Sequence, residues 1–257
     1  MPVARVVQLT DLHLFTEPER TLKEVCTRQT LQRVLDVLPR SPDAVDHLVV
    51  TGDIAHDELL ETYCRLSPLL GDWRARLRLL PGNHDNRDAM QEVFPDRIQR
   101  MGERIVFEEF AGAWRLLGLD THIPGSVNGL LGAEQLDWID SRLRADTRPT
   151  CLFMHHPPVG TGSHWLNLLG LGDAEALREL IIRHAVRLVC CGHGHQEMTV
   201  GFGGCTVLMS ASTGVQFRPN NYDFDTDPLA PGYRLLELEP DGGFRTRVIR
   251  VTADAEA

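Results

Sequence analysis

The stretch Leu80-Pro81-Gly82-Asn83-His84-Asp85 decides how the rest of this sequence is interpreted. An apolar run over Leu77 to Leu80 indicates a buried strand, and the Pro-Gly pair ends that strand abruptly. The three polar residues that follow share one tight turn at the rim of a predicted sheet, and their side chains differ in donor and acceptor ability. The other motifs with potentially reactive or metal-binding residues are expected to lie beside this turn.

Four other apolar runs also end in residues that commonly bind metals. Val6–Thr10 leads to Asp11 and His13, Leu48–Thr51 to Gly52-Asp53, Cys151–Met154 to His155-His156-Pro157, and Leu188–Cys191 to Gly192-His193-Gly194-His195. The alternation of strand and helix patterns in the first part of the chain favours a parallel sheet, with these residues at the carboxyl ends of its strands.

The types of side chain indicate what kind of metal site this is. Two carboxylates, one amide carbonyl and up to four imidazoles form a nitrogen and oxygen set, which suits manganese, iron, zinc or cobalt. Seven groups exceed what one tetrahedral ion takes, so two adjacent ions that share a bridging carboxylate are the economical interpretation. The neighbouring Cys190-Cys191 pair does not predict a thiolate site, because adjacent residues of a strand point to opposite faces.

The ordered series D-x-H, G-D, G-N-H-D, H-x-P and G-H-x-H spans Asp11 to His195 and resembles the calcineurin-like metallophosphoesterase superfamily. Within it, the chain resembles the class III cyclic-nucleotide phosphodiesterases, the bacterial cyclic-AMP phosphodiesterases in particular. This closer similarity rests on Gln8–Phe15, Ser212–Pro219, Leu229–Arg234 and Leu236–Leu238, which extend beyond the metal motifs.

The resemblance implies an α/β (α+β) fold, a four-layer αββα sandwich in which two mixed sheets pack face to face with helices outside. It assigns Asp11, His13, Asp53 and His195 to one ion and Asp53, Asn83, His155 and His193 to the other, with Asp53 as the bridge. We expect two divalent metal ions, iron or manganese first and zinc or cobalt as alternatives. No linker or repeat divides the sequence, so one domain over residues 1–257 is the simplest organisation.

Some residues of these motifs are not assigned to a metal. His84 is the candidate for stabilising charge on the phosphorus centre or protonating the leaving alkoxide, with Asp85 as its orienting partner. The alternative for His84 is a solvated loop histidine. Asn83, His84 and His193 are the expected substrate-binding residues. His155 fits the H-x-P pattern, and His156 stays open as the alternative ligand.

Other polar and aromatic residues have weaker claims. His56 is expected at a helix start or on the surface, although contact with phosphate is an alternative. Asp120 is expected to anchor a turn or to make an indirect contact with the site. Trp165 lies next to His164 in a long loop, Pro157–Gly172, where it is either a base-stacking aromatic or an ordinary loop anchor.

Apolar periodicity predicts four helices, over Leu22–Leu38, Asp57–Trp73, Gly132–Arg144 and Ala174–His184. Pro68 is expected to bend or interrupt the second of them. From Met198 onward the apolar period changes to two, which predicts short strands and hairpins.

The amino-acid composition restricts which molecules the protein is expected to bind. A formal net charge of -10 argues against nucleic acid and is compatible with a small anionic substrate at a metal centre. We expect no membrane segment, since the sequence has no run of 18 apolar residues. Six cysteines are too sparse for a disulfide scaffold, which fits the cytoplasm. The oligomeric state stays open, with a homodimer as one option.

The leading hypothesis is a metal-dependent phosphoric diester hydrolase. A metal-bridging hydroxide attacks phosphorus in line and converts 3',5'-cyclic AMP, or another cyclic nucleotide, to the nucleoside monophosphate. The alternative within catalysis is another small diester, such as a glycerophosphodiester or a 2',3'-cyclic nucleotide. A non-catalytic protein-binding module and a DNA nuclease are the competing classes. The first is disfavoured because all seven ligand positions are filled, and the second because of the acidic charge.

Overall fold

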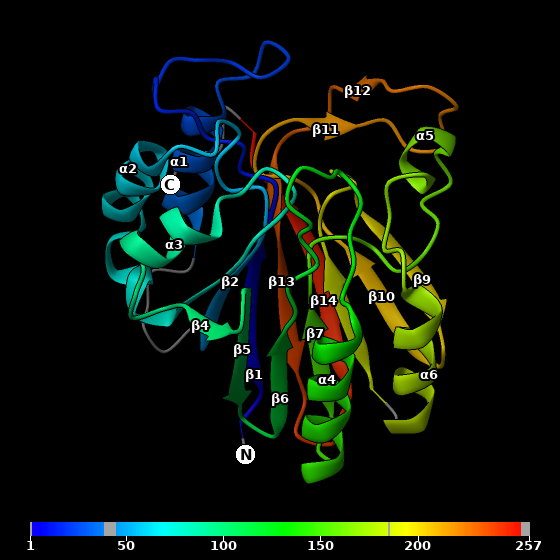
Figure 1. Cartoon of the computed structure of the whole chain (residues 1–257). Helices are drawn as coiled ribbons and strands as arrows, with labels where there is room; N and C mark the ends of the chain where they lie inside the picture. The colour runs from blue at the N-terminus through cyan, green and yellow to red at the C-terminus, as the bar shows by residue number, and fades with distance from the viewer. Residues whose placement is uncertain (1, 39–44, 185, 253–257) are drawn as a thin grey trace.

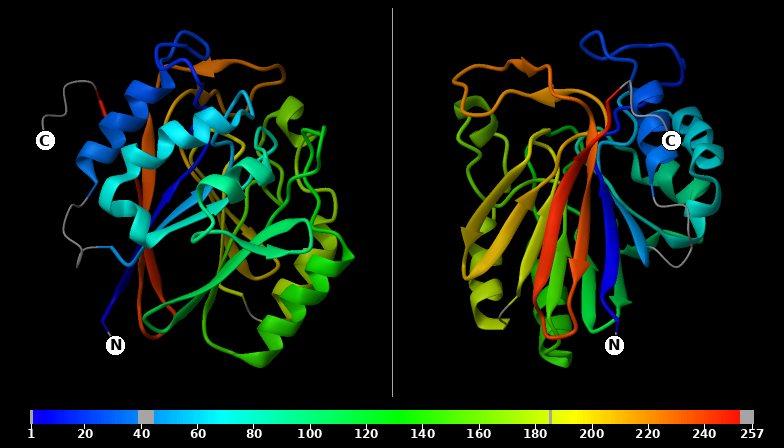
Figure 2. Two further views of the ribbon diagram at one scale, coloured as in Figure 1. Left: turned by 60° about the vertical axis from the view of Figure 1, so that its left-hand side comes forward. Right: turned by 180° about the vertical axis from the view of Figure 1, so that it is seen from behind.

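Two β-sheets form the middle of the structure, a computed structural model that describes residues 2–38, 45–184 and 186–252. Within these residues the first sheet has five strands in the order β14-β13-β1-β2-β3. They are β1 (Ala4–Leu9), β2 (His47–Thr51), β3 (Leu77–Leu80), β13 (Gly232–Leu238) and β14 (Phe244–Arg250). β1, β2 and β3 run parallel, whereas β13 is antiparallel to β1 and to β14. The rear view in Figure 2 shows β1, β13 and β14 side by side.

The second sheet has the order β4-β5-β6-β7-β8-β10-β9. Its strands are β4 (Gln99–Met101), β5 (Arg104–Ala111), β6 (Trp114–Gly118), β7 (Thr150–Phe153), β8 (Leu188–Cys191), β9 (Met198–Phe202) and β10 (Cys205–Met209). β6, β7, β8 and β10 are parallel neighbours, and antiparallel strands flank them on both sides. Both sheets are therefore mixed, as predicted.

Helices cover the outer face of each sheet (Figure 1). α1 (Thr27–Val37), α2 (Leu60–Leu70) and α3 (Arg87–Val93) share an apolar core with the first sheet, while α4 (Ala133–Ala145) and α6 (Ala174–His184) share one with the second. A third core lies between the sheets. These three cores separate four layers, which confirms the predicted αββα sandwich. The core that both sheets share also favours the single domain predicted for residues 1–257.

The central strands are apolar throughout because each has two buried faces. In β2, Leu48 and Val50 belong to the core under α1 to α3, and Val49 between them belongs to the core between the sheets. In β7, Leu152 faces the outer helices, whereas Phe153 faces the other sheet. Alternate side chains thus enter different cores, so a continuous apolar run is the pattern expected for such a strand.

The prediction of a helix over Leu22–Leu38 is wrong at its start, since α1 begins at Thr27. Leu22 and Val25 instead exchange two backbone hydrogen bonds of 2.9 Å. The two residues between them have φ angles of 49° and 68°, a conformation that no right-handed helix contains. A tight turn has taken the place of the first helical turn, although the apolar residues have helical spacing.

The helix predicted over Asp57–Trp73 is shorter at both ends. Asp57 accepts hydrogen bonds from the Thr16 and Leu59 backbone N–H groups, which holds it outside the helix. Pro68 lies inside α2, and the helix ends two residues later, before the 3₁₀ helix η2 (Gly71–Arg76).

The helices predicted over Gly132–Arg144 and Ala174–His184 are confirmed to within one residue. The long loop Pro157–Gly172 contains the short helix α5 (His164–Asn167), and a two-stranded hairpin, β11 (Gln216–Phe217) with β12 (Thr226–Asp227), lies near it at the same end of the molecule (Figure 1). None of the described helices combines the length and the hydrophobicity that crossing a bilayer requires.

Candidate metal centre

The seven predicted ligands follow five strands that end at one edge of the sandwich, the upper edge in Figure 1. β1 leads to Asp11 and His13, β2 to Asp53, β3 to Asn83, β7 to His155, and β8 to His193 and His195. The edges of the two sheets meet here, since the backbone N–H of His193 donates a hydrogen bond of 3.0 Å to Asp11 Oδ1. Both sheets therefore contribute to one site.

The first ligand group consists of Asp11, His13, Asp53 and His195, all of them buried. Their potential ligand atoms all lie within 4.8 Å of one another. His13 Nε2 is 3.4 Å from Asp53 Oδ2 and 3.0 Å from His195 Nε2, which is itself 3.4 Å from Asp11 Oδ1. Two carboxylates and two imidazoles thus converge on one point, as the first metal position requires.

The second ligand group consists of Asp53, Asn83, His155 and His193. His155 Nε2 lies 3.4 Å from Asp53 Oδ1 and 3.2 Å from Asn83 Oδ1. Asn83 Oδ1 is also 3.1 Å from His193 Nδ1. Asp53 therefore presents Oδ2 to the first group and Oδ1 to the second, which is the arrangement of a bridging carboxylate.

Two of the imidazoles are oriented by backbone carbonyls. His155 Nδ1 lies 2.8 Å from the Thr51 carbonyl oxygen, and His195 Nδ1 lies 2.8 Å from that of Val215. A carbonyl oxygen only accepts, so each Nδ1 carries a proton and Nε2 is the nitrogen that faces the site. This tautomer is the one that binds a metal through Nε2.

The backbone at this edge is strained. Five of the seven predicted ligands have positive φ angles, which are uncommon for residues other than glycine. They are Asp11 at 53°, His13 at 44°, Asp53 at 52°, His193 at 65° and His195 at 46°. Each such residue costs of order 1–3 kcal/mol and persists only where the surrounding structure enforces it, typically at functional sites.

Two motif glycines are required by close packing. A Cβ atom on Gly82 would overlap the carboxylate of Asp53, and one on Gly192 would overlap the Thr10 hydroxyl. The glycines of the G-N-H-D and G-H-x-H motifs therefore let neighbouring strand ends approach closely enough to bring their ligands together.

The charges and protonation states suit divalent ions. Burial alone would raise the pKa of Asp53, but the adjacent His155 and His13 hold this pKa well below its ordinary value, so the carboxylate is an anion at neutral pH. Burial lowers the pKa of His193 to about 3, which keeps its ring neutral. His193 Nε2 is buried and has no hydrogen-bond partner among the described residues. Burial alone would lower the pKa of His155, but the adjacent Asp53 carboxylate raises it to about 9, so a metal bound here would displace a proton from His155. Two carboxylates, an amide oxygen and imidazoles fit the predicted metals.

His155, rather than His156, directs a ring nitrogen at other predicted ligands, Asp53 and Asn83. His156 lies close enough to His155 and His193 to form a group of three potential ligands. However, its Nδ1 is 2.7 Å from Thr121 Oγ1 and its Nε2 is 3.0 Å from the Val127 carbonyl oxygen. Both ring nitrogens are thus occupied, which favours the assignment of His155.

Alanine variants of the two histidines separate these roles. We expect His155→Ala to lower diester cleavage by about 10³-fold, because a lost ligand costs several kcal/mol of charge stabilisation. His156→Ala should cost no more than about 100-fold, the scale seen when a group that supports a ligand is removed. Steady-state rates and metal content by mass spectrometry measure both effects. A larger metal loss in His156→Ala than in His155→Ala would reverse the assignment.

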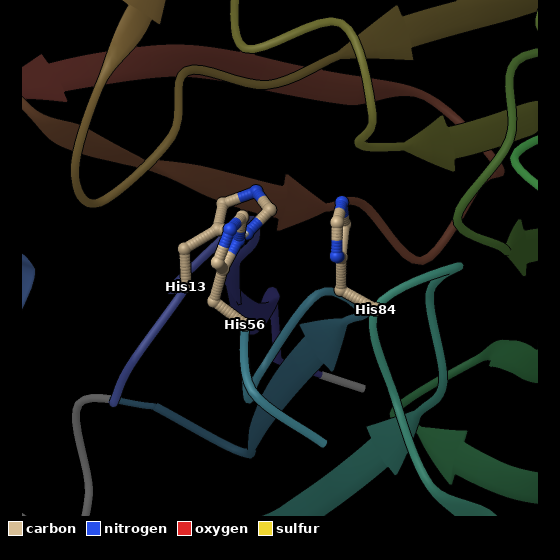
Figure 3. Close-up of side chains that lie close together, drawn as sticks. All are labelled: His13, His56 and His84. Atoms are coloured by element: carbon tan, nitrogen blue, oxygen red, sulfur yellow. Dashed lines mark hydrogen bonds between the residues drawn. The ribbon is translucent and has the colours of Figure 1, made fainter. Parts of the chain in front are cut away.

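His13, His56 and His84 gather from three different loops at this edge (Figure 3). The His84 backbone N–H donates to Asp53 Oδ1 at 2.9 Å. Its ring stacks on His56, with centroids 4.5 Å apart, and lies 5.2 Å from that of His13. His84 is thus beside the ligands and half-buried, a position that suits contact with a substrate.

The sequence predicts His56 at a helix start or on the surface, whereas in the structure it contacts the predicted ligand His13. His56 Nδ1 lies 3.0 Å from His13 Nδ1, so it orients this ligand from behind, as the two carbonyls orient His155 and His195. The only sequence signal was its position three residues after Asp53.

Asp85 does not have the geometry expected of an orienting partner for His84. Its buried carboxylate accepts hydrogen bonds from the backbone N–H groups of Ile54, Ala55 and Gly82 and from the Tyr63 hydroxyl. Burial, aided by the nearby Asp53 charge, raises the pKa of Asp85 to about 6. Asp85 therefore ties the loops after β2 and β3 together, and the described contacts favour this structural role over a catalytic one.

Asp120 anchors a turn, one of its two predicted roles. Its carboxylate accepts two hydrogen bonds from the Arg87 guanidinium, at 2.7 and 2.8 Å, and one from the backbone N–H of His122.

A cavity of about 210 Å³ opens onto the predicted ligands. Its lining combines polar residues, predicted ligands among them, with apolar and aromatic ones. The polar residues are His13, Lys23, Asp53, His56, Asn83, His84, His193 and His195, and the others are Leu22, Val127, Trp165, Leu166, Leu169, Phe217 and Phe224. A larger cavity of about 860 Å³ lies between α1 and the β11–β12 hairpin, but its described lining contains none of the seven ligands. The smaller cavity is therefore the one associated with the metal centre.

The chain matches known proteins over most of its length. A model of the calcineurin-like phosphoesterase family matches residues 4–197. The 3',5'-cyclic adenosine monophosphate phosphodiesterase CpdA of Escherichia coli K12 is 35% identical over 249 residues, which cover 96% of this chain and 90% of the relative. The protein of the same name from Pseudomonas aeruginosa is 38% identical over 248 residues, covering 96% and 89%.

Among solved structures, a purple acid phosphatase from yellow lupin superimposes with a TM-score of 0.68, covering 100% of this chain and 53% of that protein. At 14% sequence identity this similarity concerns the fold alone. The family match and the relatives agree with the enzyme class predicted from the sequence, a metal-dependent phosphoric diester hydrolase. The match over residues 4–197, together with relatives above 30% identity over nearly the whole chain, places this protein in the calcineurin-like phosphoesterase family.

Proposed function

We propose that this protein is a two-metal phosphodiesterase that hydrolyses 3',5'-cyclic nucleotides, cyclic AMP first among them, to nucleoside monophosphates. One observation carries the metal part of this proposal: Asp53 presents one carboxylate oxygen to each of two ligand groups. The names of relatives that cover nearly the whole chain support cyclic AMP as the substrate.

Asp11, His13, Asp53 and His195 would hold one ion, and Asp53, Asn83, His155 and His193 the other. When bound, two divalent ions would acidify a shared water and neutralise charge on the phosphate oxygens. Iron or manganese is our first choice for both positions, because the nitrogen and oxygen ligand set suits them.

His84 lies beside the ligands without belonging to either group, since its backbone N–H contacts Asp53 and its ring stacks on His56. We assign it to the ester oxygen that leaves as the phosphodiester ring opens, where an imidazole N–H donates a hydrogen bond or a proton. Asn83 and His193 are assigned to the substrate side of the second group, since both line the cavity. A cytoplasmic location and a homodimer stay predictions.

Steady-state kinetics test the proposal directly. Protein purified without added metal is assayed for metal content, reconstituted with manganese or iron, and supplied with cyclic AMP, cyclic GMP, a 2',3'-cyclic nucleotide and glycerophosphocholine. We expect the highest kcat/KM with cyclic AMP and loss of activity after chelation, because the ligands alone supply no Lewis acid. Faster cleavage of glycerophosphocholine than of any cyclic nucleotide would move the assignment to another diester.

A further inference from the structure

Three aromatic side chains form one side of the cavity at the metal centre. We call Trp165, Phe217 and Phe224 the aromatic wall; all three line the cavity of about 210 Å³. The Phe217 ring stacks on the ligand His195, with centroids 3.9 Å apart and planes 7° from parallel. Trp165 meets Phe217 and Phe224 edge to face at 5.4 and 5.3 Å. The aromatic surface therefore begins directly against a predicted metal ligand.

The wall is built from two distant segments that are fixed to each other. α5 supplies Trp165, and the β11–β12 hairpin region supplies the two phenylalanines. The His164 and Trp165 backbone N–H groups donate to the carbonyl oxygens of Asn221 and Tyr222, at 3.1 and 3.3 Å. The His164 and Tyr222 rings also stack, with centroids 4.6 Å apart. Figure 1 shows α5 and the hairpin together above the strand ends. These contacts set the position of the wall before a ligand binds, which reduces the cost of binding.

The polar and aromatic residues that line the cavity favour a ligand with both an anionic group and a planar apolar group. Metal ions held by the predicted ligands would attract an anion, whereas the aromatic wall favours a planar group that stacks on it. At about 210 Å³ the cavity is smaller than the roughly 300–1,000 Å³ of ordinary ligand sites, which suits one small planar group. Lys23 at the mouth, with Nζ 5.0 Å from the Phe224 centroid, adds a positive charge. A glycerol group would leave its hydroxyls against the apolar wall, which is unfavourable.

We propose that the aromatic wall binds the nucleobase of the substrate and thereby selects cyclic nucleotides over phosphodiesters that lack a planar base. This inference rests on the proposed function. It makes Trp165, Phe217 and Phe224 determinants of specificity, whereas cleavage itself belongs to the metal centre.

The test compares two substrates with the same reacting ring. One is cyclic AMP, and the other is the methyl riboside 3',5'-cyclic phosphate, in which a methoxy group replaces adenine. With manganese-loaded protein, we expect Trp165→Ala to lower the ratio of the two kcat/KM values by about 5- to 150-fold, the effect of losing one base-stacking contact. Trp165→Phe should keep most of this ratio, because the indole N–H has no hydrogen-bond acceptor among the described residues and only ring contacts need preserving.

Trp138→Ala is the matched control, since Trp138 is a half-buried tryptophan on α4, outside the cavity. It should leave the substrate ratio unchanged. If Trp165→Ala does not fold, Phe224→Ala takes its place, because the Phe224 side chain is 42% exposed and contributes less to the core. Calorimetric binding of adenosine 5'-monophosphate gives a readout independent of turnover, with the Kd expected to rise in Trp165→Ala and not in Trp138→Ala.

The outcomes distinguish this inference from the proposed function. If the wild-type protein cleaves neither cyclic phosphate, the proposed function fails and the inference fails with it. If the wild type cleaves both equally well, or if Trp165→Ala and Phe224→Ala keep the wild-type ratio and Kd, the aromatic wall does not bind the base and the proposed function still stands.

Discussion

Replacing Asp53 with asparagine is expected to lower diester cleavage by about 10³-fold and to reduce the bound metal at both positions. The substitution keeps the shape of the side chain, and Oδ1 still accepts the hydrogen bond from the His84 backbone. It removes the charge that faces both ligand groups, however, and metal assistance is worth several kcal/mol of transition-state stabilisation, which corresponds to this factor.

Metal content by mass spectrometry and kcat for cyclic AMP measure the effect. Asp96→Asn is the matched control, because Asp96 is an exposed carboxylate whose partners are Arg74 and Arg97, at 3.0 and 3.1 Å. That variant should retain wild-type metal content and rate. An Asp53→Asn protein with two bound ions and undiminished turnover would contradict the bridging role.

Truncating Trp114 to alanine is expected to reduce the free energy of unfolding by about 3–5 kcal/mol, the range seen for a buried large aromatic. Trp114 is fully buried in the core between the two sheets, and its indole N–H donates to the Glu239 carbonyl oxygen at 2.8 Å. Removing it opens a cavity and takes away one of the two hydrogen bonds that this carbonyl accepts, the other coming from the Gly242 backbone N–H. Since a whole domain is stable by only about 5–15 kcal/mol, the loss is a large fraction of the total.

Urea denaturation of metal-free protein measures this change, because bound metal would add its own stabilisation to the folded state. Trp114→Phe is the control: it keeps an aromatic ring in the core and removes the hydrogen bond, so its loss should be smaller than that of the alanine variant. A change below about 1 kcal/mol for Trp114→Ala, the typical effect of an unremarkable substitution, would show that the sheets do not depend on this contact.

The strands and the ligands that follow them were predictable because both depend on local sequence. A strand buried on two faces is apolar throughout, and Pro81-Gly82 marks its end. The pairing of Asp11 with His195, 184 positions apart, was not local, and the family resemblance implied it. The start of α1 was misjudged because the apolar residues Leu22 and Val25 have helical spacing yet form a tight turn.

Residues whose role depends on tertiary contacts were harder to predict. Asp85 stands beside His84 in the sequence, but its carboxylate points to backbone N–H groups of another loop. His56 is separated from its partner His13 by 43 positions, and no periodic pattern signals that contact. The aromatic wall joins α5 to a hairpin some 50 positions later in the chain, so the sequence alone supports two interpretations of Trp165.

The origin of the ligands in both sheets has a consequence for how the protein is made. Asp11, His13, Asp53 and Asn83 leave the ribosome early, but His193 and His195 emerge only after three quarters of the chain, and β13, which flanks β1, later still. Until His193 emerges, a nascent chain holds three of the four predicted ligands of each group. If ions bind tightly only to a completed set of ligands, we expect metal insertion to follow synthesis, and a product truncated before His193 to bind metal more weakly than the full chain.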